Sequence, residues 1–261
     1  MLTEDSLPSI TVVTPALDAA ETIAQTLASV RAQAYPKLEH VVVDGGSTDG
    51  TVDILAAAEG IRYVSEPDRG LSDAMNKGIA MASGDVIGWL NADDYYFPGA
   101  LQAVGEAFAA APQARWATGR CRIVDERGAE IRTAVTAYKN FFLRHYSLGL
   151  YLTQNFISAP ATFVRKEAYP EQPYDLRYKV SMDYDTQLKL ARASDPLFVD
   201  RELSAFRMME GTLSMSQFET QFAEHAENAR VHGDGHRVAV AINQLTSKAI
   251  VVIYRLLRRL R

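Results

Sequence analysis

Carboxylates gather in one short segment of this sequence, Gly84–Asp94, which reads Gly-Asp-Val-Ile-Gly-Trp-Leu-Asn-Ala-Asp-Asp. A hydrophobic run in this segment delivers three oxygen-bearing side chains together, those of Asn91, Asp93 and Asp94. Clustered carboxylates repel one another unless protons or a cation neutralise them, and oxygen ligands favour hard cations such as Mg²⁺ or Mn²⁺. The segment therefore predicts a divalent-metal site that can hold a diphosphate and stabilise it as a leaving group. The alternative is an aspartate pair that only caps a helix near Pro98.

A second acidic motif covers Val43–Thr51 and reads Val-Asp-Gly-Gly-Ser-Thr-Asp-Gly-Thr. Its first aspartate, Asp44, follows a hydrophobic run, and the glycines allow the chain to turn without side-chain clashes. A carboxylate at such a strand end can accept hydrogen bonds from a base or a ribose. The alternative is a plain strand-to-helix turn in which Asp49 or Thr51 caps the next helix.

A third pair of motifs covers residues 65–78. Glu66 and Asp68 belong to a Ser-Glu-Pro-Asp-Arg-Gly run at an expected strand end, and Asn76 and Lys77 lie on the helix that follows. Taken alone, this pattern is more typical of a solvated loop and an ordinary amphipathic helix. Its place beside the other two motifs makes these residues candidates for the site.

The elements that must position these motifs alternate along the first hundred residues. Short hydrophobic runs predict four strands, at residues 10–14, 38–43, 61–64 and 85–90. Apolar residues at helical spacing predict three helices between them, over 23–30, 52–58 and 71–81. Asp18 and Glu21 resemble a capping box before the first helix. Strands spaced by helices imply a mostly parallel sheet, whose ligands gather at the carboxyl ends of the strands.

The second half of the chain is less regular. Residues 115–124 and 129–135 predict a hairpin, and the aromatic-rich stretch 138–152 predicts helix. Further patterns predict a strand at 161–164, a helix at 182–193 and an extended segment at 197–207. His232 and His236 flank a Gly-Asp-Gly run, which favours a surface loop over a metal site. Without an internal repeat or a low-complexity linker, we expect a single domain over residues 1–235, followed by a C-terminal helix over 236–261.

Composition excludes some classes of protein. The net charge of −5 provides no global basic surface for nucleic acid. The single cysteine, Cys121, rules out an intrachain disulfide and a cysteine-rich zinc site. The first nine residues lack the basic start and apolar run of a signal peptide. Together these features predict a cytoplasmic protein.

The ordered set of motifs resembles the family 2 glycosyltransferases, and more narrowly the bacterial members that build exopolysaccharide, O-antigen and colanic-acid-type repeats. The set comprises Thr-Pro at 14–15, the motifs of residues 43–51 and 65–78, and Asn-Ala-Asp-Asp at 91–94. The resemblance implies a GT-A fold, an α/β architecture with a Rossmann-like, mostly parallel sheet flanked by helices. Its nucleotide-binding half would cover about residues 8–98 and its acceptor half about 99–215. The implied reaction is an inverting transfer from a nucleoside-diphosphate sugar to a saccharide or polyprenyl-linked acceptor.

The resemblance also implies roles for single residues. Pro15, Asp44 and Asp68 would line the base and ribose pocket, with Thr14 and Glu66 beside them. Asn91-Ala-Asp93 occupies the place of the family's metal-binding Asp-X-Asp, so Asp93 would be the main ligand of Mn²⁺ or Mg²⁺ and Asn91 would touch the ribose. The expected contacts with the donor sugar and diphosphate are Asp94, Asn76, Lys77 and Arg207.

The segment Tyr178–Asp185 resembles the family segment that supplies the catalytic base at a helix start. By that match Asp183 is the base and Asp185 a supporting group. A helix N-terminus would tend to keep Asp183 ionised and ready to accept a proton from the acceptor hydroxyl. The alternative is that Asp183 only caps the helix.

The segment Phe206–Ser214 resembles a late family segment that often contains Arg-X-His. Arg207 would face the diphosphate, where a guanidinium fork fits well. Met209 stands where the family often has histidine.

The C-terminal run 248–261 is apolar on one side and carries four arginines. A basic amphipathic helix of this kind can lie on an anionic bilayer, which would place the protein peripherally on the inner face of the membrane. The alternative is a helix that packs on the domain or on a second subunit. Two rival functions are a non-catalytic nucleotide-sugar binder and a nucleotidyltransferase. The second is disfavoured because residues 14–18 lack a basic side chain for a triphosphate.

Overall fold

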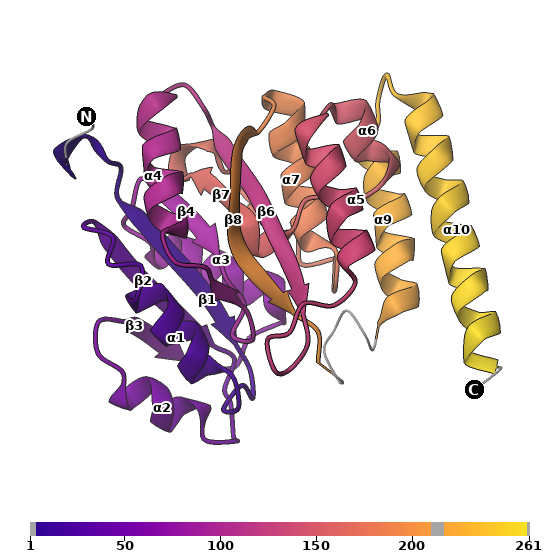
Figure 1. Ribbon diagram of the computed structural model, residues 1–261. Coiled ribbons are helices and arrows are strands. Elements are labelled where there is room, and N and C mark those ends of the chain that lie inside the picture. Colours follow the sequence, from indigo (N-terminus) through magenta and orange to yellow (C-terminus); the bar gives the residue numbers. More distant parts are fainter. Residues whose placement is uncertain (1–3, 210–216, 260–261) are drawn as a thin grey trace.

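The computed structural model describes residues 4–209 and 217–259, and its centre is a sheet flanked by helices (Figure 1). The strands are β1 (Ile10–Ala16), β2 (Leu38–Asp44), β3 (Arg62–Ser65), β4 (Val86–Trp89), β5 (Tyr95–Tyr96), β6 (Trp116–Val124), β7 (Thr162–Arg165) and β8 (Leu197–Arg207). The main helices are α1 (Ile23–Arg31), α2 (Thr51–Ala57), α3 (Leu71–Met81), α4 (Ala100–Ala110), α5 (Thr133–Arg144), α6 (Leu148–Thr153), α7 (Met182–Ala193), α9 (Phe218–His232) and α10 (Arg237–Arg259).

The first half of the sheet is parallel, as the alternating pattern predicts. The strand order is β3-β2-β1-β4-β7-β6-β8-β5, and β1 pairs in parallel with both β2 and β4. Val12 and Val13 of β1 and Val42 of β2 have no exposed surface. Strands buried on both faces are typically near-continuous runs of such β-branched residues. The carboxyl ends of these strands therefore form one edge.

The second half of the sheet is mixed. Strand β7 is antiparallel to β4 and to β6, whereas β6 runs parallel to β8. Among the described strands, four of the seven pairings are parallel. The expected α/β fold is confirmed, and its parallel character comes mainly from β1, β2, β3 and β4.

Two local predictions are wrong. The capping box is absent, because α1 begins at Ile23 and Asp18 instead accepts a hydrogen bond from the backbone N–H of Thr48 at 2.9 Å. The predicted hairpin is reduced to a single bridge between Val124 and Glu130, and the chain turns into α5 at Thr133. Both errors arise where a contact with a distant segment, or a switch to helix, overrides a local pattern.

The aromatic-rich stretch is helical, but it is divided into α5 and α6. The Ser147 side chain accepts a hydrogen bond from the Leu150 N–H at 3.2 Å and so starts the second helix. Tyr151 and Leu152 of α6 are fully buried in a cluster that also contains Tyr184 of α7. This cluster connects the helical part of the chain to the sheet.

The last helix, α10, packs on one side only, against α9 and α6, and forms an outer boundary of the molecule (Figure 1). Its Asn243 side chain donates a hydrogen bond to the Leu152 carbonyl at 2.9 Å. In the described part of the chain, no helix has both the length and the hydrophobicity that crossing a bilayer requires.

Candidate active site

The motifs around Asp44 and Asp93 lie at the same edge of the sheet. Strands β2 and β4 pair with opposite sides of β1, so they lie about 10 Å apart across the sheet, or two strand spacings. Asp44 is opposite Ala16, the last residue of β1. Ala16 in turn belongs to the same buried cluster as Ala92, the neighbour of Asp93. The fold thus brings these two acidic segments together, as the sequence predicts.

The carboxylate of Asp44 organises the turn that follows β2. Its Oδ2 accepts hydrogen bonds from the backbone N–H groups of Gly46 and Ser47, both at 3.0 Å, and from the Ser65 hydroxyl at 2.6 Å. Burial alone would raise the pKa of Asp44, but these bonds and one from the Ser47 hydroxyl outweigh it and lower the pKa. Asp44 is therefore an ionised, buried group that holds the turn, and its predicted contact with a base or ribose stays a prediction.

Asp68 faces this turn from the loop after β3. Its Oδ1 accepts a hydrogen bond from the Gly70 N–H at 2.7 Å, and its Oδ2 lies where a side chain on Gly45 would project. A Cβ atom at Gly45 would be 2.7 Å from that oxygen, and the exposed Leu17 borders the same spot. The absence of a side chain at Gly45 therefore leaves room for the Asp68 carboxylate at the surface.

Replacing Gly45 with alanine is expected to displace the Asp68 carboxylate and to raise the KM for the donor about tenfold. The backbone of Gly45 is outside the left-handed region, so the chain itself tolerates alanine there. Gly149→Ala is the matched control, because its Cβ would meet only the His236 ring at an ordinary 3.5 Å. Steady-state kinetics against donor concentration measure the effect. An unchanged KM for the donor in Gly45→Ala would show that the Asp68 carboxylate does not contribute to donor binding.

Other predicted donor contacts are engaged within the protein. The Thr14 hydroxyl lies 3.0 Å from Nε2 of His40, and both residues are buried. Burial lowers the pKa of His40 to about 4, so its ring is neutral at pH 7. Pro15 is buried in β1 opposite Val43 of β2, and its predicted role also stays a prediction. Lys77 of α3 forms a 2.8 Å ion pair with the exposed Glu66, which leaves both at the surface beside Asp68.

Asn76 fastens α3 to a distant loop. Its amide donates to the Tyr174 carbonyl at 2.8 Å and accepts from the Tyr174 N–H at 3.0 Å. The Tyr174 ring in turn packs edge-on against Trp89, with centroids 5.0 Å apart. The predicted contact of Asn76 with the donor stays a prediction. The two hydrogen bonds show that Asn76 holds the loop at Tyr174 against α3.

Hydrogen bonds fix the polar side chains of the segment after β4. Asn91 accepts a hydrogen bond from the Trp89 indole N–H at 2.6 Å and donates one to Asp94 Oδ2 at 3.0 Å. The other oxygen of Asp94 accepts from the Arg207 backbone N–H at 2.9 Å. Asp94 has no exposed surface, and burial together with the charge of Asp93 raises its pKa well above the usual range. Asp94 therefore joins β4 to β8, and its predicted donor contact would require it to become exposed.

Asp93 is the carboxylate of this segment that remains partly accessible. Burial raises its pKa, and the nearby Arg207 guanidinium opposes that shift. Within the described residues, no three His, Cys, Asp or Glu side chains converge as a ready-made metal site. Mg²⁺ and Mn²⁺ often need only one or two protein carboxylates when substrate phosphates and water complete the shell. The donor set at Asp93 thus fits a cation that is held jointly with a diphosphate.

Arg207 is buried at the end of β8, close to Asp93 and Asp94. Its guanidinium contacts the Gln25 side chain and lies over the Tyr95 ring at 5.6 Å. Its Nε is buried and has no hydrogen-bond partner in the described part of the chain. Because this Nε is covered, a ligand oxygen would reach it only after a local rearrangement, and would then satisfy a costly unpaired donor. The remainder of the predicted Arg-X-His segment, residues 210–214, lies outside the described residues.

Asp183 stands in the first turn of α7, as predicted. It lines a small cavity together with Trp89, whose indole N–H binds Asn91. Trp89 therefore connects the predicted base to the predicted metal segment. Burial raises the pKa of Asp183 to about 6, although the Tyr184 N–H and the charge of Lys139 oppose the shift. A pKa of about 6 still leaves most of Asp183 ionised at pH 7, as expected, although desolvation outweighs the effect of the helix N-terminus and raises the pKa.

The segment that carries Asp183 is clamped by α9. The Glu224 carboxylate accepts hydrogen bonds from three successive backbone N–H groups, those of Lys179 at 2.8 Å, Val180 at 3.0 Å and Ser181 at 2.8 Å. The Asn228 amide donates to the Ser181 carbonyl at 3.1 Å. Sequence reasoning missed this clamp, because its partners are more than 40 residues apart and no local motif links them.

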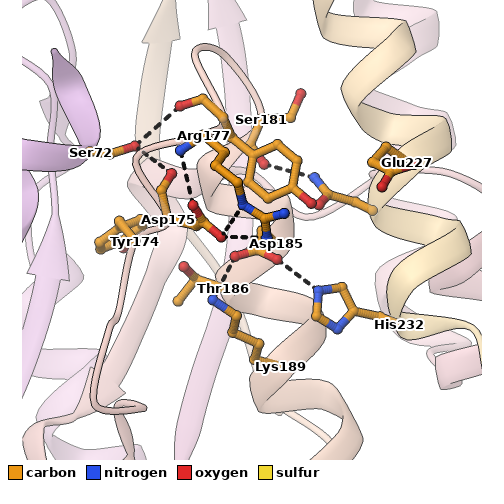
Figure 2. Close-up of polar contacts among 12 residues, drawn as sticks. Ser72, Tyr174, Asp175, Arg177, Ser181, Asp185, Thr186, Lys189, Glu227 and His232 are labelled. Atoms are coloured by element: carbon orange, nitrogen blue, oxygen red, sulfur yellow. Dashed lines mark hydrogen bonds and ion pairs between the residues drawn. The ribbon is translucent and has the colours of Figure 1, made fainter.

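Asp185 forms the second part of this clamp (Figure 2). It is buried, and its two oxygens lie 2.7 Å from Lys189 Nζ and 2.7 Å from His232 Nε2. The predicted loop is present at residues 233–236, where Asp234 and Gly235 are exposed, but His232 itself ends α9 and is buried against α7. Ser72 of α3 approaches the same loop from the other side and donates to the Tyr178 carbonyl at 3.3 Å (Figure 2). The supporting role predicted for Asp185 is consistent with this position.

Glu224→Ala is expected to reduce the free energy of unfolding by about 2–4 kcal/mol, because three backbone donors lose a charged acceptor. We also expect kcat to fall with little change in the KM for the donor, since the base moves and the donor site does not. Glu227→Ala is the matched control, as the Glu227 carboxylate binds the exposed Arg230 on the same helix. Denaturant unfolding and steady-state kinetics provide the two readouts. Equal effects of the two substitutions would contradict a positioning role for Glu224.

Comparisons with known proteins agree with this architecture. The sequence model of glycosyl transferase family 2 matches residues 11–171 of this chain. An uncharacterised glycosyltransferase of Mycobacterium tuberculosis is 32% identical over 241 residues, which cover 89% of this chain and 84% of the relative. A glycosyltransferase of PGL/p-HBAD biosynthesis from Mycobacterium bovis is 30% identical over 200 residues, covering 74% of this chain and 73% of the relative.

Solved structures share the fold at low identity. TarS of Staphylococcus aureus superposes with a TM-score of 0.62 at 16% identity, over 84% of this chain and 39% of TarS. The chain thus spans about two fifths of TarS. The mannosyltransferase PcManGT of Pyrobaculum calidifontis, solved with GDP-Man and Mn²⁺, superposes with a TM-score of 0.61 at 18% identity, over 96% of this chain and 80% of that one. The chain belongs to glycosyl transferase family 2, and its fold is GT-A.

Proposed function

We propose that this protein transfers a sugar, with inversion, from a nucleoside-diphosphate sugar to a hydroxyl group of a saccharide or lipid-linked saccharide in cell-surface polysaccharide synthesis. The observation that carries the proposal is the connection through Trp89, which contacts Asn91 of the metal segment and lines the same cavity as Asp183. A donor bound at Asp93 would therefore lie next to a group able to accept a proton. TarS and PcManGT, which bind UDP and GDP-Man respectively, support a donor of this class.

Each group of residues in the site has its own role in the proposed reaction. Asp68 and the turn held by Asp44 would receive the nucleoside, and Arg207, whose Nε has no partner among the described residues, would bind the phosphates. A divalent cation held at Asp93 would neutralise the charge that develops on the departing diphosphate. Asp183 accepts the proton of the acceptor hydroxyl as that oxygen attacks the anomeric carbon. The bond between the anomeric carbon and the diphosphate oxygen breaks, the nucleoside diphosphate leaves, the new glycosidic bond forms, and no covalent enzyme intermediate is required.

A thermal-shift screen against nucleoside diphosphates, with and without Mn²⁺, tests the proposal. We expect one nucleoside diphosphate to raise the Tm only when Mn²⁺ is present, since the two share the site at Asp93. Release of the free nucleoside diphosphate from the matching sugar donor, stimulated by an acceptor, then demonstrates transfer. A donor that binds but is never turned over with any acceptor would favour a non-catalytic binding protein.

A further inference from the structure

The helix α10 carries large apolar residues on its outer side. Six of its exposed apolar residues share one face at the helical spacing of 100° per residue. They are Val238, Ile242, Leu245, Val252, Ile253 and Leu256. Val238 is 76% exposed and Leu245 is 69% exposed. We call these six residues the outer stripe.

The opposite face of α10 combines two buried polar residues with half-buried apolar ones such as Val240, which packs close to Gly233. Asn243 and Ser247, four residues apart, are buried against the rest of the protein, and the Asn243 amide binds the Leu152 carbonyl. A helix that only covered a domain would present its apolar stripe to the core and its polar face to water. The large apolar side chains exposed along the outer side of α10 indicate that the outer stripe meets an apolar partner.

Charge identifies that partner. Residues 237–261 contain six Lys or Arg residues and no Asp or Glu, although the whole chain has a net charge of −5. Arg237, Lys248 and Arg255 are 11 and 7 residues apart, which places them along one flank of the outer stripe. Arg255 also binds Glu219 of α9 at 2.8 Å, yet its side chain remains 59% exposed.

A second copy of α10 would complement this surface poorly. In a helical dimer the flanking positions usually carry opposite charges. No acidic residue within 237–261 could pair with Lys248 or Arg255, and an antiparallel pair would set the two basic flanks against each other. An anionic lipid surface satisfies both features, because apolar side chains enter the boundary between headgroups and acyl chains while the basic flank meets lipid phosphates.

We propose that α10 lies along an anionic lipid bilayer and holds the protein at its surface. The C-terminal end of α10 is at the same end of the molecule as the carboxyl ends of β6 and β8 (Figure 1). Membrane contact along α10 would therefore bring that end of the molecule close to the lipid. This inference does not depend on sugar transfer, although it places a lipid-linked acceptor within reach if the proposed function holds.

Co-sedimentation of the full chain with vesicles tests the proposal. We expect binding to phosphatidylcholine vesicles that contain phosphatidylglycerol, and much weaker binding to pure phosphatidylcholine vesicles or at high salt. The double substitution Leu245→Asn and Val252→Asn should weaken binding about tenfold or more. Lys248→Glu should weaken it at low salt. Val231→Asn, an exposed apolar position on α9, is the matched control and should bind as the wild type does.

Thermal unfolding and Mn²⁺-dependent nucleotide binding, measured without vesicles, show that the variants are folded and keep the distant site intact. Equal binding to both kinds of vesicle would overturn the proposal, and so would wild-type binding by the double variant. A wild-type dimer in solution that the double variant converts to monomer would assign the outer stripe to a second copy instead. Failure of the nucleotide assay alone would count against the proposed function and not against the lipid surface.

Discussion

Asp183→Asn is expected to lower the rate of sugar transfer about 10²–10⁴-fold, the usual contribution of a positioned general base. Asparagine fills nearly the same volume at the start of α7 but cannot accept the proton of the acceptor hydroxyl. The nucleotide edge at Asp44 and Asp68 is formed by other elements, so the affinity for the donor should be nearly unchanged. Kinetics of transfer, together with a titration of the donor, separate these two effects.

The same substitution should not destabilise the protein. The pKa of Asp183 is raised to about 6 in the folded state, so the folded protein binds this proton more tightly than the unfolded chain does. Stability from this group is therefore greatest below its unfolded pKa of about 4 and is lost as the pH rises through about 6. At pH 7 the ionised, desolvated carboxylate lowers stability, and asparagine removes that cost. We expect the Tm of Asp183→Asn to equal or exceed that of the wild type.

The pH dependence provides a further check on this prediction. Transfer by the wild type should rise with pH through about 6, as Asp183 loses its proton, and the residual activity of Asp183→Asn should lack that rise. Asp185→Asn is the matched control on the same helix. It breaks a buried pair with Lys189 and His232, so its main effect should be a lower Tm. A wild-type pH profile that persists in Asp183→Asn would assign the base to another residue.

Asp93→Ala is the second substitution with a large expected effect. It removes the accessible carboxylate of the metal segment, and we expect Mn²⁺-dependent binding of the nucleoside diphosphate to weaken at least about 100-fold. Isothermal titration with and without Mn²⁺ measures this. Since burial raises the pKa of Asp93, its removal should not lower the Tm of the ligand-free protein.

Asp94→Asn provides the matched control for Asp93→Ala. Asp94 is fully buried and binds Asn91 and the Arg207 backbone, so it should influence stability more than metal affinity. The Mn²⁺-dependent binding should therefore persist in Asp94→Asn. If Mn²⁺-dependent binding were lost in Asp94→Asn and retained in Asp93→Ala, the metal ligand would be Asp94 and not Asp93.

The sequence predicts the parallel half of the sheet well because its signals are local. The β-branched runs of β1 and β2 and the helical spacing of α3 are complete within short windows, and the observed bounds of α3 and α7 agree with the predicted ones. These local patterns also predict that Asp44 and Asp93 lie near each other, because the carboxyl ends of parallel strands lie at one edge of the sheet. The predicted capping box and hairpin fail because Asp18 binds Thr48 and because the chain after Glu130 turns into α5.

Features that depend on long-range contacts could not be predicted in the same way. The pKa of Asp183 is decided by how deeply the helix start is buried, and no residue type near it encodes that depth. The bonds from Glu224 to residues 179–181 join segments more than 40 positions apart. The link between Thr14 and His40 likewise arises only when β1 and β2 pair.

The most direct test of the central claim is a crystal structure with the preferred nucleoside diphosphate and Mn²⁺, in which anomalous scattering locates the metal. We predict a manganese peak at coordination distance from the Asp93 carboxylate, bridged to the diphosphate, with the nucleoside against the Gly45–Asp68 surface and Asp183 facing the free end of the diphosphate. A nucleotide bound away from the carboxyl edge of β1, β2 and β4, or a manganese ion without contact to Asp93, would contradict the account.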